Sequence, residues 1–223
     1  MKKILIIAVH PDDESLGAGG TLLHHKSNGD QIHWLILTSP SNLDNYTNTF
    51  IKNREKNIKQ VAKAYGFHSV TELNFPTTNL SEISESTLVQ AISKVFHTIE
   101  PNIIYMPFYS DVHGDHKIAF SAIFSCTKLF RYPSIEKVLM IETISETDQA
   151  ISTPSFSFSP NVFIDITPHI EQKLKILSFY ETEIKEPPFP RSLEAIRALA
   201  CVRGATIHTH YAEAFMLLKE VIK

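Results

Sequence analysis

Cysteine, glycine and long apolar runs are all scarce in this chain of 223 residues. The two cysteines, Cys126 and Cys201, lie far apart, which excludes a disulfide framework and is typical of a reducing compartment. No apolar run approaches the roughly 18–20 residues that cross a membrane. The apolar run at 4–9 is shorter than that of a signal peptide, so we interpret it as a buried strand. We therefore expect a cytoplasmic protein without a transmembrane segment.

Positive charge is not in excess either. The chain has 21 Lys and Arg against 24 Asp and Glu, a formal net charge of −3 and a pI of about 6.4. This balance argues against nucleic-acid partners, which require a strongly positive surface. A hydrophobic fraction of 43% with 20% charged residues is ordinary for a globular protein. The length predicts a single domain over 1–223 and leaves homo-oligomer formation open.

Apolar runs typical of buried strands alternate with segments in which apolar residues recur at helical spacing. We expect strands at 3–9, 32–38, 70–75, 103–109, 137–142 and 162–166. We expect helices at 16–26, 51–65, 88–99, 118–130, 170–181 and 192–202, whereas 211–221 fits either a strand or a helix. This alternation predicts an α/β fold, with a Rossmann-like, mostly parallel β-sheet flanked by helices in three layers (α/β/α).

Two charged clusters follow the first and the fourth predicted strands. They are His10-Pro11-Asp12-Asp13-Glu14 and His113-Gly114-Asp115-His116, and four of the seven glycines lie in or beside them, where the backbone turns sharply or approaches a ligand. Ligands bind such sheets beyond the carboxyl ends of the strands, where the strand order reverses. In the common order 3-2-1-4 the first and fourth strands are neighbours there, so we expect the clusters to meet. We expect loops at 39–50 and 146–160 to lie near this site.

The clusters combine imidazoles with carboxylates. This mixture suits Zn²⁺, with Fe²⁺ or Co²⁺ as substitutes, and a cation would relieve the repulsion between three carboxylates in one turn. Catalytic zinc takes three protein ligands and activates a water, and a carboxylate that is not a ligand can act as general base. The clusters therefore predict hydrolysis of an amide or ester. The glycine-rich segment 17–20 does not fit a dinucleotide-binding turn, because the position three after Gly19 is Leu22.

The first cluster stands in a longer motif, Ala8-Val9-His10-Pro11-Asp12-Asp13-Glu14 followed by Gly19-Gly20-Thr21. This motif resembles the signature of the PIG-L/LmbE-like N-acetylglucosaminyl deacetylases, and the second cluster resembles the second motif of that family. A weaker likeness at Arg54, at Glu142 and at 211–215 extends the resemblance over nearly the whole chain.

The resemblance implies a role for each residue of the two motifs. His10, Asp13 and His116 would ligate zinc. Asp12 would be the general base, which later returns its proton to the leaving amine. His113 would donate to the oxyanion or assist as an acid.

Other polar residues are expected to support the ligands or to contact the substrate. Within the motifs, Glu14 would support the site and Asp115 would orient an imidazole. Arg54 and Glu142 belong to the weaker part of the resemblance. His210 lies on an extended segment from which it could reach the pocket.

The expected function is zinc-dependent removal of the acetyl group from an N-acetylglucosamine-type substrate, which releases acetate and a free amine. The expected partner is a small-molecule acetylated amino-sugar conjugate, and Arg54, Arg191 and Arg203 are candidates to hold a polar or anionic part of it. Two alternatives remain open at this stage. One is a catalytically silent sugar-binding protein of the same fold, and the other is a different metal-dependent amide or ester hydrolase.

Overall fold

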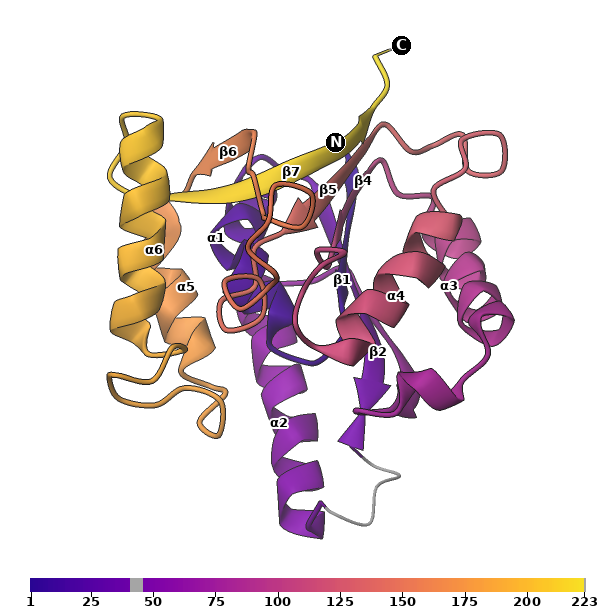
Figure 1. Ribbon diagram of the computed structural model, residues 1–223, viewed down its shortest axis with the longest axis horizontal. Helices are drawn as coiled ribbons and strands as arrows, with labels where there is room; N and C mark the ends of the chain where they lie inside the picture. The colour runs from indigo at the N-terminus through magenta and orange to yellow at the C-terminus, as the bar shows by residue number, and fades with distance from the viewer. Residues whose placement is uncertain (41–45, 223) are drawn as a thin grey trace.

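The computed structural model describes residues 1–40 and 46–222, and within them seven strands form one sheet (Figure 1). The strands are β1 (Lys3–Ala8), β2 (Gln31–Ser39), β3 (Ser69–Pro76), β4 (Ile103–Met106), β5 (Lys137–Ile141), β6 (Val162–Asp165) and β7 (Ala212–Glu220). Their order is β3-β2-β1-β4-β5-β7-β6. The first five strands run parallel, whereas β7 pairs antiparallel with β5 and β6. The predicted α/β fold with a mostly parallel sheet is confirmed, and the C-terminal segment is a strand.

Helices cover both faces of the sheet. They are α1 (Asp13–Ser27), α2 (Asn48–Tyr65), α3 (Glu85–Ile99), α4 (Gly114–Ser125), α5 (Ile170–Leu177) and α6 (Leu193–Thr206). In Figure 1, α3 and α4 lie on one side of the sheet and α1, α2, α5 and α6 on the other, which makes the three expected layers. Among the residues that the structure describes, none of the helices is both long enough and apolar enough to cross a membrane.

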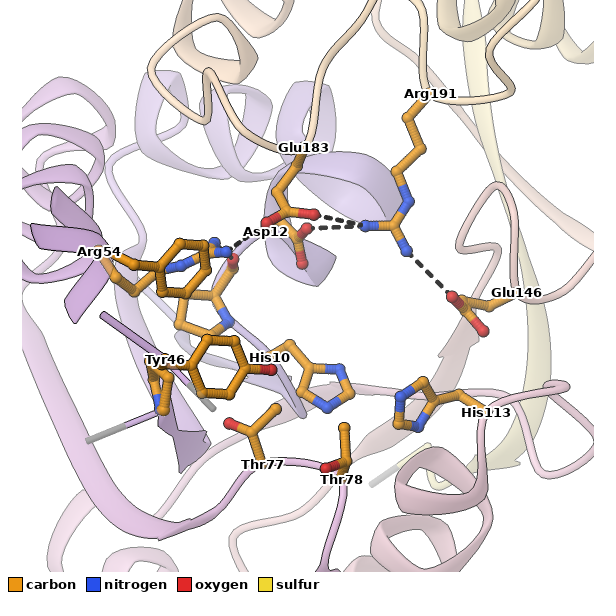
Figure 2. Close-up of a pocket in the computed structure, with 13 residues that line it drawn as sticks. His10, Asp12, Tyr46, Arg54, Thr77, Thr78, His113, Glu146, Glu183 and Arg191 are labelled. Atoms are coloured by element: carbon orange, nitrogen blue, oxygen red, sulfur yellow. Dashed lines mark hydrogen bonds and ion pairs between the residues drawn. The ribbon is translucent and has the colours of Figure 1, made fainter. Parts of the chain in front are cut away.

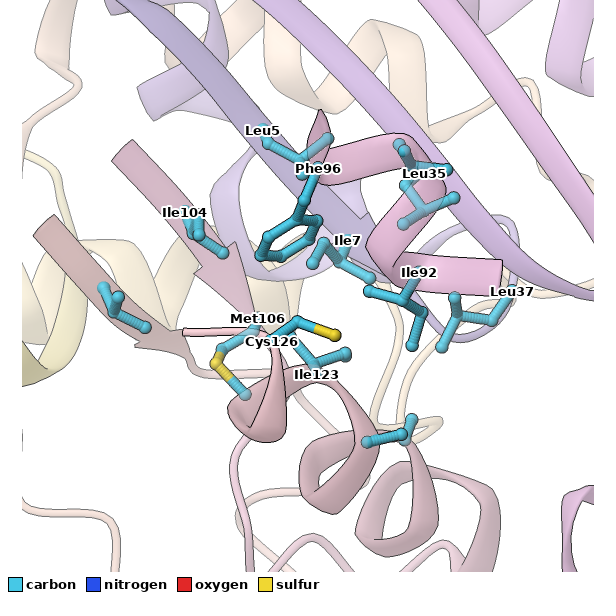
Figure 3. Close-up of a cluster of buried hydrophobic side chains, with 14 of the residues drawn as sticks. Leu5, Ile7, Leu35, Leu37, Ile92, Phe96, Ile104, Met106, Ile123 and Cys126 are labelled. Carbon is cyan, nitrogen blue, oxygen red and sulfur yellow. The ribbon is translucent and has the colours of Figure 1, made fainter. Parts of the chain in front are cut away.

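Strand β1 is buried on both faces, which explains its uninterrupted aliphatic sequence. Leu5 and Ile7 pack in one apolar cluster with side chains of α3 and α4, part of which Figure 3 shows. Ile4 and Ile6 point to the opposite face and pack in a second cluster with side chains of α1 and α2. The strand is therefore fixed between two cores, and its carboxyl end is a rigid support for the residues that follow it.

The helices that follow β1 and β4 begin earlier than the sequence predicts. Helix α1 begins at Asp13 rather than at 16, and α4 begins at Gly114 rather than at 118. The positive end of a helix dipole favours carboxylates in the first turn, and the His113 side chain caps α4 by accepting from the Asp115 N–H (3.1 Å). The charged residues are thus part of the helix starts. Because β1 and β4 pair directly, the two helix starts lie side by side.

Of the two segments predicted as loops, one lies partly in a strand and a helix and the other is irregular throughout. Helix α2 begins at Asn48, where the Thr47 side chain accepts from the Phe50 N–H (3.1 Å), so the segment 39–50 includes the end of β2 and the first turn of α2. Residues 41–45 of that prediction lie outside the described residues. The segment 146–160, all of it described, contains neither a helix nor a strand.

The glycines after the first motif lie inside α1, because other elements approach its backbone closely. A Cβ atom added to Gly20 would lie 2.7 Å from Cβ of Ile166, and one added to Gly19 would lie 2.5 Å from Oη of Tyr65. Such distances are shorter than van der Waals contact. The glycines therefore serve the packing of α1 rather than a turn.

We expect Gly20→Ala to lower the free energy of unfolding by about 1–3 kcal/mol, because the new methyl group overpacks against Ile166. The better helix propensity of alanine, worth at most about 1 kcal/mol, only partly offsets this cost. Urea unfolding at neutral pH measures the change. Gly114→Ala is the matched control, since a Cβ there has no atom within 4 Å. Equal stability of the two variants would contradict the packing argument.

Candidate active site

The two charged clusters meet at the carboxyl ends of β1 and β4, beside a cavity of about 260 Å³ (Figure 2). The rings of His10 and His113 lie 4.6 Å apart between centroids, although about 100 residues separate them in the sequence. The cavity is lined by His10, Pro11, Asp12, Pro40, Tyr46, Phe50, Arg54, Thr77, Thr78, His113, Glu146, Glu183 and Arg191. The sheet thus brings both motifs to one site.

His10, Asp13 and His116 form a group that could hold a metal ion. One potential ligand atom from each lies within 4.8 Å of the others. The Oδ2 atom of Asp13 lies 3.4 Å from Nε2 of His116 and 4.0 Å from Nδ1 of His10. The Nε2 atom of His116 is buried and has no hydrogen-bond partner, which is costly unless a ligand satisfies it. The donor set of two imidazoles and one carboxylate fits a catalytic zinc site with an open position.

Asp111, which sequence reasoning missed, orients His116. The Nδ1–H of His116 donates to Oδ2 of Asp111 (2.8 Å), and the Thr147 hydroxyl donates to Oδ1 of Asp111 (2.7 Å). This contact leaves the lone pair of the imidazole on Nε2, the atom that faces Asp13. A carboxylate behind a histidine in this way is common in metal sites. Its position shortly after β4 and five residues before His116 was the available sequence signal.

We expect Asp111→Asn to weaken zinc binding by about 10–100-fold, because the amide accepts more weakly and can present its NH₂ group to the imidazole. Titration with a competing chelator measures this affinity. Asp165→Asn, at the end of β6, is the control and should leave the zinc affinity unchanged. An unchanged affinity in Asp111→Asn would mean that Asp111 does not orient a metal ligand.

A second group, His10, His113 and Asp115, also lies within metal-binding distance. Its Asp115 carboxylate is already engaged, because it accepts from the N–H groups of Thr78 (2.7 Å) and Leu80 (3.2 Å). Oδ2 of Asp115 also lies 3.2 Å from Nε2 of His10, and Nδ1 of His113 accepts from the Asp115 N–H. These contacts favour Asp115 as the group that orients His10, and leave Nδ1 of His10 for the first group.

The adjacent carboxylates Asp12 and Asp13 have opposite electrostatic environments. Burial alone would raise the pKa of Asp13. The electrostatic interaction with His116 and a hydrogen bond from the His10 N–H (2.8 Å) outweigh burial and hold the pKa of Asp13 below its usual range. Burial and the charge of Asp13 raise the pKa of Asp12 to about 7. Paired titratable groups whose environments push their pKa values apart commonly take different roles in catalysis. This arrangement suits Asp13 as a ligand and Asp12 as a base.

Glu14 is fully buried and supports the backbone of Asp12. Its carboxylate accepts from the Asp12 N–H (3.0 Å), from the Ser15 hydroxyl (2.6 Å) and from the Tyr180 hydroxyl (2.8 Å). Burial raises the pKa of Glu14 to about 7. Asp12 has a φ of 147°, a strained conformation for a residue other than glycine. The contacts of Glu14 help to hold this conformation.

Two arginines and two glutamates complete the wall around Asp12 (Figure 2). Nη1 of Arg191 lies 3.0 Å from Oδ2 of Asp12, and its Nη2 lies 3.0 Å from Oε1 of Glu146. Arg54 forms an ion pair with Glu183. Arg54 was predicted from the resemblance, whereas Glu146 and Glu183 carry no motif and were missed, although Glu146 begins the loop predicted to lie near the site.

Glu142 and His210 do not join the residues that line the cavity. Glu142 pairs with Arg203 of α6, whose Nε lies 2.9 Å away, and both line a separate cavity of about 20 Å³. The backbone of His210 packs against α6 at Gly204, where an added Cβ would lie 2.8 Å from the His210 carbonyl carbon. The packing of α6 therefore holds both residues away from the two motifs.

Two curated relatives of the chain are named as deacetylases. It is 26% identical over 221 residues to the diacetylchitobiose deacetylase of Thermococcus kodakarensis, a match that covers 96% of this chain and 82% of the relative. It is 23% identical over 192 residues to a probable N-acetyl-alpha-D-glucosaminyl L-malate deacetylase 2 of Bacillus cereus, with 82% and 84% of the two chains covered.

Solved structures share the fold. The N,N'-diacetylchitobiose deacetylase of Pyrococcus horikoshii superimposes with a TM-score of 0.79 at 20% identity, over 97% of this chain and 84% of that chain. A 4-carboxy-2-hydroxymuconate hydratase of Pseudomonas putida superimposes with a TM-score of 0.76 at 17% identity, over 100% and 98% of the two chains. At these identities the likeness concerns the fold, which hosts more than one reaction.

A family comparison covers both motifs. The family described as PIG-L, GlcNAc-PI de-N-acetylase, matches residues 5–127, more than half of the chain. The match includes every residue of the His10–Asp13–His116 group and the carboxylate of Asp12. On this match, together with the shared fold, the chain belongs to the PIG-L family.

Proposed function

We propose that this protein is a zinc-dependent deacetylase that hydrolyses the acetamido group of an N-acetylglucosamine-type sugar to acetate and a free amine. The observation that carries the proposal is the buried Nε2 of His116, which has no hydrogen-bond partner and lies 3.4 Å from the Asp13 carboxylate and close to His10. The names of the curated relatives support the reaction, because each describes the deacetylation of an N-acetylated sugar.

His10, Asp13 and His116 would hold the metal. A divalent metal at this position supplies a Lewis acid that polarises the acetyl carbonyl and lowers the pKa of a water molecule. Asp111 and Asp115 fix the two imidazoles through the ring nitrogens that face away from Asp13, so the group is organised before a metal arrives.

Asp12 accepts the proton of the attacking water while the water oxygen adds to the carbonyl carbon. Asp12 lines the cavity and belongs to neither metal-binding group, so its carboxylate is available for this role. The proton then passes from Asp12 to the amide nitrogen as the C–N bond breaks, which yields acetate and the amine.

His113 donates a hydrogen bond to the oxygen that becomes negative during the attack. Its Nδ1 accepts from the Asp115 N–H, so the proton of the neutral ring resides on Nε2. Burial, together with the charge of His10, lowers the pKa of His113 to about 4, which favours the neutral ring. A preorganised donor of this kind stabilises such an oxygen by a few kcal/mol.

The test is a measurement of acetate release by the zinc-loaded protein from N-acetylglucosamine and from short N-acetylglucosamine oligomers, with and without a chelator. We expect release that stops on chelation and returns when zinc is added. Stoichiometric zinc without acetate release from any acetylated amino sugar would contradict the proposal and favour a silent sugar-binding protein. Acetate release from simple esters alone would favour the alternative of a different metal-dependent hydrolase.

A further inference from the structure

Every polar nitrogen of Arg191 in the cavity wall already has a partner. Its Nη1 pairs with Asp12 and lies 3.5 Å from Glu183, its Nη2 pairs with Glu146, and its Nε donates to the Ser145 hydroxyl (2.7 Å). The side chain is only 17% exposed. A phosphate or carboxylate on a substrate would therefore meet a guanidinium whose charge three carboxylates already compensate.

Arg54 is also engaged, at two of its three nitrogens. Its Nη2 forms an ion pair with Glu183, and its Nη1 donates to the carbonyl oxygen of Pro11 (2.6 Å). The guanidinium carbon also lies 5.4 Å from the centre of the Phe50 ring and 5.7 Å from that of Tyr180. These contacts fix the guanidinium in the wall as a structural element, with its charge compensated.

The charges of the cavity therefore disfavour an anion. Three carboxylates (Asp12, Glu146 and Glu183) and two guanidiniums line the cavity. No lysine is among the described residues that line it. Even with Asp12 protonated, the carboxylates equal the guanidiniums in number. A metal held by His10 and its neighbours would add positive charge only at the end of the cavity that the acetyl carbonyl must reach, where Asp13 offsets part of it.

The opposite wall offers neutral contacts. Figure 2 shows Thr77 and Thr78 on the side of the cavity away from Glu183 and Arg191, and Tyr46 beside Arg54. The ring of Tyr46 stacks on that of Phe50, with 4.9 Å between centroids. Hydroxyl groups and a fixed aromatic ring are suited to the hydroxyls and the apolar face of an uncharged sugar.

We propose that the cavity selects electrically neutral N-acetyl sugars and excludes those that carry a phosphate or carboxylate next to the acetylated ring, with Glu146 and Glu183 as the residues that set this selectivity. This inference rests on the proposed deacetylase function and narrows its substrate class. An anionic sugar would be left without a counter-charge and close to like charges, whereas a neutral sugar would not.

The test compares two ligands that differ at one position, methyl N-acetyl-β-glucosaminide and N-acetylglucosamine 1-phosphate. Acetate release gives kcat/KM for each, and calorimetry gives Kd for each on the zinc-loaded protein. We expect the neutral sugar to be favoured by about tenfold or more in both quantities. We expect Glu183→Gln, which frees the Arg54 guanidinium and keeps the side-chain shape, to reduce this preference several-fold by improving the phosphate ligand. Glu171→Gln breaks an exposed arginine pair remote from the cavity and should leave the preference unchanged.

The outcomes of this test distinguish failure of the proposed selectivity from failure of the proposed deacetylase function. Equal or better binding of the phosphate ligand by the unmodified protein would overturn it, as would an unchanged preference in Glu183→Gln. Absence of binding by both sugars would also overturn it, because the cavity is assigned to the neutral one. If neither sugar is deacetylated but the neutral one binds more tightly, the proposed reaction fails while the selectivity stands.

Discussion

Replacing Asp12 with asparagine should lower the rate of acetate release by about a thousandfold and leave the zinc content unchanged. The amide cannot accept the proton of the attacking water, whereas Asp12 is in neither of the groups that could hold a metal. Asparagine has nearly the same shape and tolerates a positive φ better than most residues, so the strained backbone at this position can persist. Arg191 keeps its contacts with Glu146 and Glu183.

Steady-state kinetics and metal analysis of the same preparations make the test. Asp13→Asn is the informative comparison, because it replaces a proposed ligand and should lose both zinc and turnover. If Asp12→Asn keeps normal zinc and undiminished turnover, Asp12 is not the general base. Loss of zinc from Asp12→Asn would instead make Asp12 a ligand and require a different base.

The part of the site that could be predicted lies on the chain next to buried strands. The aliphatic run of β1 and the apolar start of β4 fix two adjacent parallel strands, and whatever follows them must emerge at the same edge. The motif residues His10 to Glu14 and His113 to His116 are contiguous with those strands. Their convergence therefore follows from periodicity and topology, without knowledge of the loops.

The remaining site residues come from segments whose path no local pattern determines. Glu183 and Arg191 lie between α5 and α6, and Glu146 lies in the loop after β5; of these, only Arg191 was a candidate from the sequence. Tertiary packing brings their side chains to the cavity. In the sequence, a charged residue in an irregular segment gives no sign of whether it will be solvated or paired. Glu142 is the opposite case: the sequence placed it near the site, but tertiary packing pairs it with Arg203 of α6 and holds it elsewhere.

A buried ion pair holds α1 against the rest of the fold. Nζ of Lys173 lies 2.7 Å from Oε1 of Glu213, and both side chains are almost fully buried. The Glu213 carboxylate also accepts from the N–H groups of Gly20 (2.8 Å) and Thr21 (2.7 Å), and Lys173 donates to the carbonyl oxygen of Leu16 (3.0 Å). Because Asp13 and Glu14 occupy the first turn of the same helix, this pair also supports the geometry of the candidate site.

Glu213→Gln should lower the free energy of unfolding by about 3–5 kcal/mol, because it leaves the Lys173 ammonium buried without a counter-charge. The amide can accept from only one of the two N–H groups of α1 and turns its own NH₂ towards the other. Lys173→Met should cost less, since Glu213 keeps both backbone donors. Urea unfolding at neutral pH measures all of these changes. Glu220→Gln, in the exposed pair with Lys137, is the control and should cost under about 1 kcal/mol. If Glu213→Gln is no more harmful than this control, the buried pair does not hold α1 in place.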